Sequence, residues 1–300
     1  MNDLPLDQVR TLLAVVDEGT FDAAAAALGV TPSAVSQRVK ALEQRTGRVL
    51  LLRTKPVRPT ESGTQVVRFA RQLAQLDRDL RVGLGTPGES VRLPIAINAD
   101  SLATWILPAL TRVPDVYFDL HREDESHTAA LLREGLVMAA VTSSPEPVAG
   151  CSVRPLGLMR YLPVAAPAFA ERWLAGPLRQ CVADAPVVVF DRRDVLQDVF
   201  VRGLTERPAA DRRHHVPSSE GFLAAIVAGL GWGLVPTMQA RPRLAAGELV
   251  ELTDRVLDVP LFWQQWKLDS PALSATSDAV FAAARARLEP PGRAARSGRG

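Results

Sequence analysis

The chain has 300 residues, about twice the usual size of a single domain, so two or three packed units are expected. Hydrophobic residues make up 47% and charged residues 23%, as in a globular chain with a full-sized core, and the net charge of +2 excludes a polycation or an acidic tail protein. Two cysteines are too few for a disulfide framework. The first residues lack a secretory pattern and no apolar run reaches the roughly 18 residues of a membrane span, so we expect a soluble, cytoplasmic protein without a membrane partner.

Residues 4–45 are predicted to form three short helices. The first two end at Gly19 and Gly29, and Thr31 caps the third, with Pro32 at its first position, where a missing N–H is harmless. Two helices joined by a short turn that contains glycine are typical of a helix-turn-helix.

The third helix has an apolar and a polar face. Its apolar face, which we expect to be buried, consists of Val35, Val39 and Leu42. Its polar face carries hydroxyls, an amide and cations: Ser33, Ser36, Gln37 and Lys40, with Arg38 beside them. Such side chains can bond base edges while the cations contact phosphate, so this helix is predicted to enter a DNA major groove. The alternative is a solvated polar face followed by a basic loop.

A basic segment follows this helix. Between residues 31 and 60 seven basic residues face a single acid, Glu43. The stretch VLLLRTKPVRPT indicates two short strands around a proline-broken turn, a β-wing that would place Arg53 and Arg58 on the DNA backbone. Residues 1–60 are therefore predicted to be a winged helix-turn-helix domain.

Residues 61–84 show the cleanest helical periodicity in the chain, and Thr60 stands before them as an N-cap. Apolar side chains recur at spacings of three and four along this segment: Val66, Phe69, Leu73, Leu76 and Leu80. A helix between two domains has little chain of its own to cover such a seam, so the pattern favours a dimer formed by residues 61–88. The alternative is a helix that lies on its own domain.

Residues 89–289 alternate strand-like and helical patterns, which predicts an α/β domain with largely parallel sheets. The expected strands are 93–98, 116–120, 137–142, 161–165, 187–190, 233–235 and 261–265. The expected helices are 102–110, 129–134, 196–204, 221–228 and 271–288. Residues 290–300, rich in Pro, Gly and Arg, are predicted to be a disordered tail.

The stretch FDAAAAALGVTPSAVSQRVKALEQRTGRVLLLRTKPVRPTESG resembles the winged helix-turn-helix of LysR-type transcriptional regulators. Four later segments resemble the subgroup of that family that regulates lysine and arginine export: INADSLATWILPAL, EDESHTAALLREG, APVVVFDRRD and SSEGFLAAIVAGLGWGLVP. The resemblance extends from residue 4 to about residue 288, and only the C-terminal tail has no counterpart.

The resemblance implies a linker helix and an effector domain of two α/β subdomains like those of periplasmic binding proteins. It implies a DNA-bound homotetramer, built as a dimer of dimers, that contacts RNA polymerase and controls an exporter in response to lysine or arginine. It carries base and phosphate contacts over to Ser33, Ser36, Gln37, Arg38, Lys40 and Arg53. Thr31 and Arg58 join this set of predicted DNA-binding residues from the reasoning on the residues themselves.

A lysine or arginine effector would need an anion site at one end and carboxylates at the other. The segment from Asn98 to Ser101 ends a strand and opens a helix, where N–H groups and the hydroxyls of Ser101 and Thr104 can hold a carboxylate. Ser219 and Glu220 open a second helix across the expected cleft. Asp100 and Asp191 rank first among acids for the cations because each ends an apolar strand, ahead of Glu125 and Glu220. Thr142 also ends a strand and is expected to line the cleft.

For each acid the alternative is a solvated surface residue or an N-cap. Trp105 and Trp232 are expected in the core rather than at the ligand, and the four histidines lack a metal-ligand spacing, so neither a metal nor a cofactor is expected. No motif of an enzyme is present. The remaining alternatives are a solute-binding protein, which would have no use for the basic helix-turn-helix, and a LysR-type regulator that responds to a different small metabolite.

Overall fold

The computed structural model describes residues 4–85, 90–122 and 125–290. Its N-terminal part is a small helical domain, α1 (Leu6–Glu18), α2 (Phe21–Leu28) and α3 (Pro32–Thr46), followed by the antiparallel strands β1 (Leu51–Leu52) and β2 (Arg58–Pro59). The predicted helix-turn-helix and wing are therefore present. Thr20 and Thr31 cap α2 and α3 by accepting hydrogen bonds from Ala23 N and Ala34 N, and the apolar faces of the three helices form one core.

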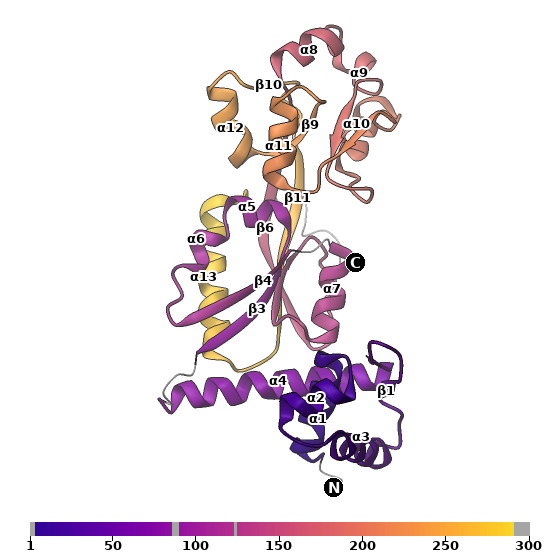
Figure 1. The fold of residues 1–300 in the computed structure, drawn as a ribbon. Coiled ribbons are helices and arrows are strands. Elements are labelled where there is room, and N and C mark those ends of the chain that lie inside the picture. Colours follow the sequence, from indigo (N-terminus) through magenta and orange to yellow (C-terminus); the bar gives the residue numbers. More distant parts are fainter. Residues whose placement is uncertain (1–3, 86–89, 123–124, 291–300) are drawn as a thin grey trace, which may run out of the picture.

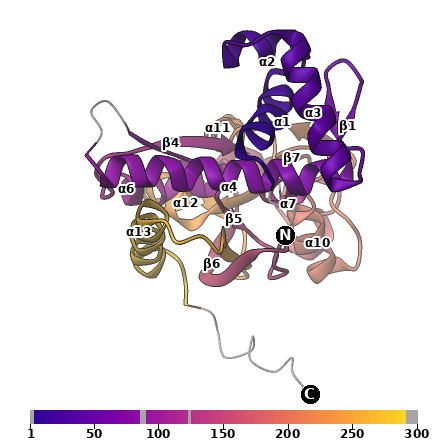
Figure 2. The ribbon, with the colours of Figure 1, turned by 90° about the horizontal axis from the view of Figure 1, so that it is seen from below.

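A single long helix, α4 (Glu61–Gly83), follows the wing. Thr60 caps it by accepting a hydrogen bond from Gly63 N at 3.0 Å, as the sequence predicts. Figures 1 and 2 show α4 lying lengthwise between the helix-turn-helix and the α/β domain. It packs on its own chain along one face, yet its predicted apolar seam is largely uncovered, since Phe69, Leu76 and Leu80 are 43%, 38% and 61% exposed.

The rest of the described chain is an α/β domain of two lobes (Figure 1). Lobe I contains β3 (Val91–Ile97), β4 (Val116–Arg122), β5 (Ala139–Thr142), α5 (Ala99–Thr104), α6 (Leu107–Leu110), α7 (Glu125–Glu134) and α13 (Pro271–Arg287). Lobe II contains α8 (Pro167–Trp173), α9 (Leu178–Cys181), β7 (Val187–Val189), α10 (Leu196–Thr205), β8 (Arg213–His215), α11 (Ser219–Val227), β9 (Gly233–Pro236), α12 (Thr237–Ala245) and β10 (Val250–Glu251). Two long strands, β6 (Cys151–Ala165) and β11 (Leu257–Trp266), pass through both lobes.

The main sheet is mixed, which corrects the expectation of largely parallel sheets. Its strand order is β10-β6-β11-β5-β3-β4, with β9 also paired to β6. Only β3 pairs in parallel there, with β4 and β5, and β7 pairs in parallel with β8 in a small second sheet. The chain crosses between the lobes once in each direction, along β6 and β11, so these strands pair antiparallel with each other.

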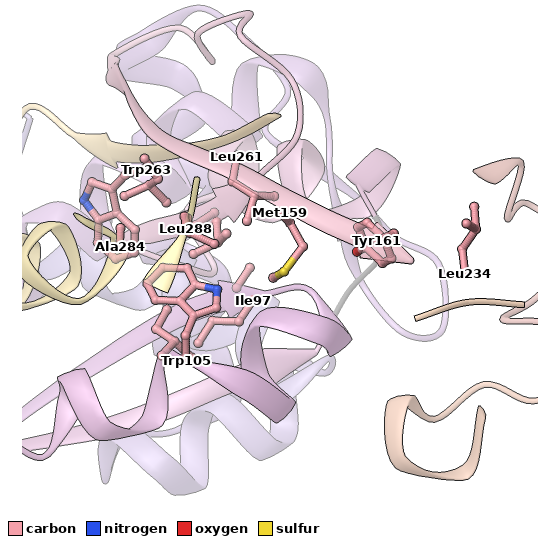
Figure 3. Close-up of a cluster of buried hydrophobic side chains, with 14 of the residues drawn as sticks. Ile97, Trp105, Met159, Tyr161, Leu234, Leu261, Trp263, Ala284 and Leu288 are labelled. Atoms are coloured by element: carbon pink, nitrogen blue, oxygen red, sulfur yellow. The ribbon is translucent and has the colours of Figure 1, made fainter. Parts of the chain in front are cut away.

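The largest core cluster lies along the two crossing strands. Figure 3 shows Ile97 and Trp105 of lobe I gathered near Met159 of β6 and Leu261 of β11. Trp105 and Trp232 are 1% and 0% exposed, which confirms the expectation that both are core residues. Strands β6 and β11 thus connect the two lobes through one shared core.

Two further expectations are corrected by the structure. The expected helix 102–110 is two helices, α5 and α6, because Pro108 can enter a helix only in its first turn. The expected strand 161–165 is the end of the 15-residue strand β6. Of the predicted tail, residues 290–300, all but the first residue lie outside the described residues. None of the described helices is both long and apolar enough to span a membrane.

Candidate nucleic-acid interface and ligand cleft

Helix α3 presents its polar face away from the core. Val35, Val39 and Leu42 are buried, as predicted. The side chains on the other face are exposed or half-buried: Thr31, Ser33, Ser36, Gln37 and Lys40. Thr31 Oγ1 lies 3.0 Å from Ser33 Oγ, so the start of the helix offers paired hydroxyls. This face can bond base edges in the way the sequence predicts.

Arg38 lies differently from its neighbours on this face. Its Nη1 is 3.5 Å from Thr11 Oγ1 and its Nε is 3.8 Å from Asp7 Oδ2, both on α1. Arg38 therefore spans the gap between α3 and α1, a contact that the helical periodicity of α3 alone could not reveal.

The wing is basic and exposed. Arg53 and Arg58 are both exposed, and the Arg53 guanidinium lies 5.8 Å from the centre of the Phe21 ring at the start of α2. The one acid of this region, Glu43, accepts a hydrogen bond from Leu50 N at 2.8 Å, so its charge is used to anchor the wing to α3. Lys40, Arg53 and Arg58 are exposed and give this face positive charge.

A cavity of about 690 Å³ lies between the two lobes, where β6 and β11 pass from one lobe to the other. We call it the effector cleft. Its wall is formed by residues from both lobes and both crossing strands: Asn98, Ala99, Asp100, Ala129, Ser143, Ser144, Tyr161, Phe190, Asp191, Arg193, Asp194, Val195, Leu196, Gln197, Ser219, Phe222, Leu234, Pro236, Gln239, Val259 and Leu261. The position follows the rule that ligands of α/β folds bind beyond the carboxyl ends of parallel strands.

Asp100 joins the two lobes across this cleft. Tyr161 of β6 donates a hydrogen bond to Asp100 Oδ2 at 2.7 Å, and Ser219 of α11 donates one to Asp100 Oδ1 at 2.7 Å. Burial raises the pKa of the Asp100 carboxyl above its ordinary value, although both hydrogen bonds act to lower it. The sequence predicted Asp100 and Ser219 on opposite sides of a cleft, and the structure brings them into direct contact.

Asp194 is a second half-buried acid of the cleft, which the sequence analysis missed in favour of Asp191. Its Oδ2 accepts a hydrogen bond from Phe190 N at 2.8 Å and its Oδ1 one from Leu196 N at 3.0 Å. Burial raises the pKa of Asp194, and the nearby charge of Asp100 raises it further. Two carboxyl groups with raised pKa values in one cavity favour a cationic ligand, whose charge would stabilise the ionised form of both.

Asp191 also lines the cleft, as predicted, but its Oδ1 accepts hydrogen bonds from Arg193 N at 2.7 Å and Asp194 N at 3.0 Å. It therefore folds the loop that presents Asp194. The spacing Asp-Arg-Arg-Asp before a helix is typical of such a turn, in which the first acid accepts hydrogen bonds from the backbone N–H groups that follow it.

Four predicted effector residues do not form the cleft wall. Ser101 is buried and its N–H already bonds Asn98 Oδ1 at 2.7 Å, and the Thr104 hydroxyl bonds Asp100 O at 2.5 Å. Thr142 is buried and accepts a hydrogen bond from Ser144 N at 3.1 Å, so the two serines that follow it reach the cleft instead. Glu220 is exposed outside the wall, where its charge raises the pKa of Asp100.

Glu125, the remaining predicted residue, begins α7, and its side chain lies outside the described residues. Tyr161, Gln197 and Gln239 were missed because their place in the wall depends on the path of β6 and on the packing of lobe II. Among the described residues no group of three or more His, Cys, Asp or Glu side chains gathers as metal ligands would.

Two family models match the chain. The bacterial regulatory helix-turn-helix protein, lysR family, matches residues 6–64, and the LysR substrate binding domain matches residues 88–285. Together they cover the DNA-facing domain and both lobes.

Individual relatives are similar over nearly the whole chain. The lysine export transcriptional regulatory protein LysG of Corynebacterium glutamicum is 45% identical over 294 residues, which cover 97% of this chain and all of that protein. The crystal structure of ArgP from Mycobacterium tuberculosis has a TM-score of 0.90 at 47% identity, covering 95% of this chain and 98% of that one. Full-length LysG of Corynebacterium glutamicum with bound effector Arg has a TM-score of 0.82 at 44% identity, covering 95% of this chain and all of that one.

Proposed function

The chain belongs to the LysR family of bacterial transcriptional regulators, and on that premise we propose that it binds promoter DNA and senses a basic amino acid, lysine or arginine, in the effector cleft. The observation that carries the proposal is the pair of half-buried carboxyl groups, Asp100 and Asp194, in one cavity of suitable size. The arginine in the related Corynebacterium glutamicum structure supports the same ligand class.

Each end of a basic amino acid finds a complementary group in the cleft. Asp100 and Asp194 would receive the α-ammonium and the distal cation. The hydroxyls of Ser143 and Ser144 and the guanidinium of Arg193, which also line the cleft, would receive the α-carboxylate. The largely apolar remainder of the wall suits the aliphatic stem of either amino acid.

The ligand would act through the contact between the lobes. Asp100 belongs to lobe I and Ser219 to lobe II. A cation that pairs with Asp100 would therefore compete with the hydrogen bond from Ser219 across the cleft. A ligand shifts an equilibrium between lobe arrangements only if it binds one of them better, and contacts from both lobes provide that difference. The changed arrangement would reach DNA through α4, which touches both α1 and α7.

On DNA the face of α3 would read bases and the wing would hold the phosphate backbone. The proposed base-reading residues are Ser33, Ser36 and Gln37, and the proposed phosphate contacts are Thr31, Arg38, Lys40, Arg53 and Arg58. The exposed seam of α4 supports a dimer, and family membership supports a dimer of dimers that meets RNA polymerase in the cytoplasm. The controlled gene would be an exporter of the sensed amino acid, as the name of the Corynebacterium glutamicum relative indicates for that protein.

The test has two parts on the purified full-length protein. Melting temperature is followed against each of the twenty amino acids, and duplexes are selected from a random-sequence library. We expect a rise in melting temperature with lysine or arginine alone and recovery of one duplex motif. A rise in melting temperature with a different amino acid would indicate a LysR-type regulator with another effector. Failure to recover any duplex motif would contradict the DNA-binding function.

A further inference from the structure

A second cavity lies where the DNA-binding domain, α4 and lobe I meet, and it shares no lining residue with the effector cleft. It has a volume of about 590 Å³ and is bounded by α1 and α2 of the DNA-binding domain, by α4, and by lobe I. We call it the junction cavity. Its wall consists of Arg10, Leu13, Asp17, Leu28, Arg71, Ala74, Asp77, Arg78, Arg81, Pro94, Gly135, Leu136 and Met138.

The wall of the junction cavity carries more cations than anions. Four guanidinium groups face two carboxylates. Asp77 is shared, since its Oδ2 lies 3.1 Å from Arg81 Nη2 and 3.7 Å from Arg10 Nη2. Asp17 is used by Arg71, whose Nη2 lies 2.5 Å from Asp17 Oδ1 and whose Nη1 donates to Glu134 O at 2.7 Å.

Arg78 differs from the other three arginines of the wall, each of which lies near Asp17 or Asp77. Its Nε is shielded from solvent, and within the part of the chain that the structure describes it has no hydrogen-bond acceptor. Buried N–H groups are almost always paired, so the shielded Nε–H of this half-buried, permanently charged side chain calls for an acceptor. The surplus positive charge of the wall and the unpaired Nε–H are separate observations, and an anion would satisfy both.

The apolar seam of α4 does not account for this cavity. Ala74, Arg78 and Arg81 recur at spacings of three and four and share one side of the helix, whereas Leu73, Leu76 and Leu80 share another. Adjacent residues of a helix point about 100° apart, so Leu73 and Ala74 represent distinct faces. A second copy seated on the seam would therefore leave the junction cavity beside it.

We infer that the junction cavity binds a small organic dianion, with a phosphate or a pair of carboxylates as its head and an apolar body. Guanidinium forks bind both kinds of head through paired hydrogen bonds. The volume exceeds what inorganic phosphate fills, and Leu13, Leu28, Leu136 and Met138 offer apolar surface for the rest of the ligand. This site is independent of the basic amino acid proposed for the effector cleft.

An anion bound here would hold the DNA-binding domain, α4 and lobe I in the arrangement that forms the cavity. It would contact Arg10 from α1 and Arg78 from α4 next to Gly135, which follows α7. Because the wall exists only when the three parts are assembled, such a ligand would favour that arrangement and thereby change the affinity for DNA. The cavity would be a second input to the regulator, of opposite charge to the first.

The experiment titrates the full-length protein with phenyl phosphate, phthalate and inorganic phosphate by calorimetry, without DNA. We expect phenyl phosphate or phthalate to bind more tightly than inorganic phosphate, and the better of the two identifies the head group. Arg78→Gln should weaken that binding roughly tenfold or more, through loss of a charged fork. Ala74→Met, which fills the cavity without changing charge, should weaken it as well.

Two matched variants serve as controls. Arg133→Gln makes the same charge change on exposed α7 outside the cavity, and Arg53→Gln removes a cation of the DNA-facing wing. Both should leave the titration unchanged. The inference is overturned if none of the three anions binds the wild-type protein, if Arg53→Gln abolishes the binding, or if Arg78→Gln and Ala74→Met both leave it intact. It is also overturned if Arg78→Gln changes the sedimentation of the protein, because an acid of a second copy would then be the partner of Arg78.

Discussion

Asp100 and Asp194 are the two side chains on which the charge selectivity of the effector cleft depends. Removing a carboxylate that pairs with a desolvated cation should reduce ligand affinity by about 2–5 kcal/mol, since the cation is left buried and unpaired. We therefore expect Asp100→Asn and Asp194→Asn to abolish most arginine binding in calorimetry, while Asp278→Asn, on the exposed side of α13, should not. Binding of arginine to both cleft variants at wild-type affinity would remove these acids from the site.

The raised pKa values of the same two acids predict a pH dependence. Each carboxyl must be ionised to pair with a cation, and burial makes each hold its proton to higher pH than an ordinary aspartate does. Arginine affinity should thus fall as the pH is lowered from 8 toward the raised pKa values, and Asp100→Asn should flatten the profile. An affinity that rises as the pH falls would contradict the assignment.

On α3 and the wing, base reading and phosphate contact should separate. Gln37→Ala should weaken binding to the selected duplex by roughly 1–3 kcal/mol and leave binding to unrelated DNA nearly unchanged, because only base contacts carry sequence information. Arg53→Ala should weaken binding to all sequences and reduce the slope of log affinity against log salt by about one. Identical behaviour of the two variants in anisotropy titrations would show that the roles are assigned wrongly.

The residues of the cleft differ in how far the sequence predicts them. Asp100 and Ser219 could be predicted because each follows a strand or opens a helix, which places it at the carboxyl edge of a sheet. Asp194 could not be separated from Asp191 by pattern, since only the folded loop shows that Asp191 caps the turn while Asp194 accepts hydrogen bonds from Phe190 N and Leu196 N. Tyr161 could not be predicted at all, because its role depends on β6 crossing both lobes.

At the scale of elements, α4 carries the prediction about assembly. Leu73 is half-buried and Leu76 is 38% exposed in the single chain, on the seam that a second copy would cover. Leu73→Asp combined with Leu76→Asp would place two charges in that interface, at a loss of several kcal/mol. Sedimentation should then show smaller particles, and DNA affinity should collapse. Particles of unchanged size would show that the dimer interface lies on another surface of the protein.

Helix ends were predictable and the longest strand was not. Thr20, Thr31 and Thr60 cap their helices through the hydrogen bonds that their side chains favour, so the local sequence determines these boundaries. Strand β6 escaped prediction because Pro155 and Gly157 interrupt its apolar pattern. Those residues lie opposite the register shift in β11 between Leu261 and Phe262, a bulge that only the paired strands reveal.

At the scale of the molecule, α4 is the element through which the cleft and DNA would communicate. Arg68 donates from α4 to Ala149 O at 2.8 Å, and Arg71 joins Asp17 of α1 to Glu134 O at the end of α7. Gly135 permits this approach, because a Cβ there would lie 2.8 Å from the Trp266 ring and 3.2 Å from Arg68 Cα. Trp266 ends β11, a strand that also lines the effector cleft, so one continuous element connects ligand and linker.

The central claim is that a distal positive charge in the effector cleft changes how the protein holds DNA. The most direct test uses the selected duplex, labelled at both ends, and follows energy transfer between the labels at saturating protein while arginine or citrulline is added. Citrulline matches arginine in shape and keeps the α-ammonium, but it lacks the distal cation, one of the two positive groups that Asp100 and Asp194 would bind. We predict a saturable change with arginine and none with citrulline. Equal responses to both ligands, or no response to either arginine or lysine, would contradict the account.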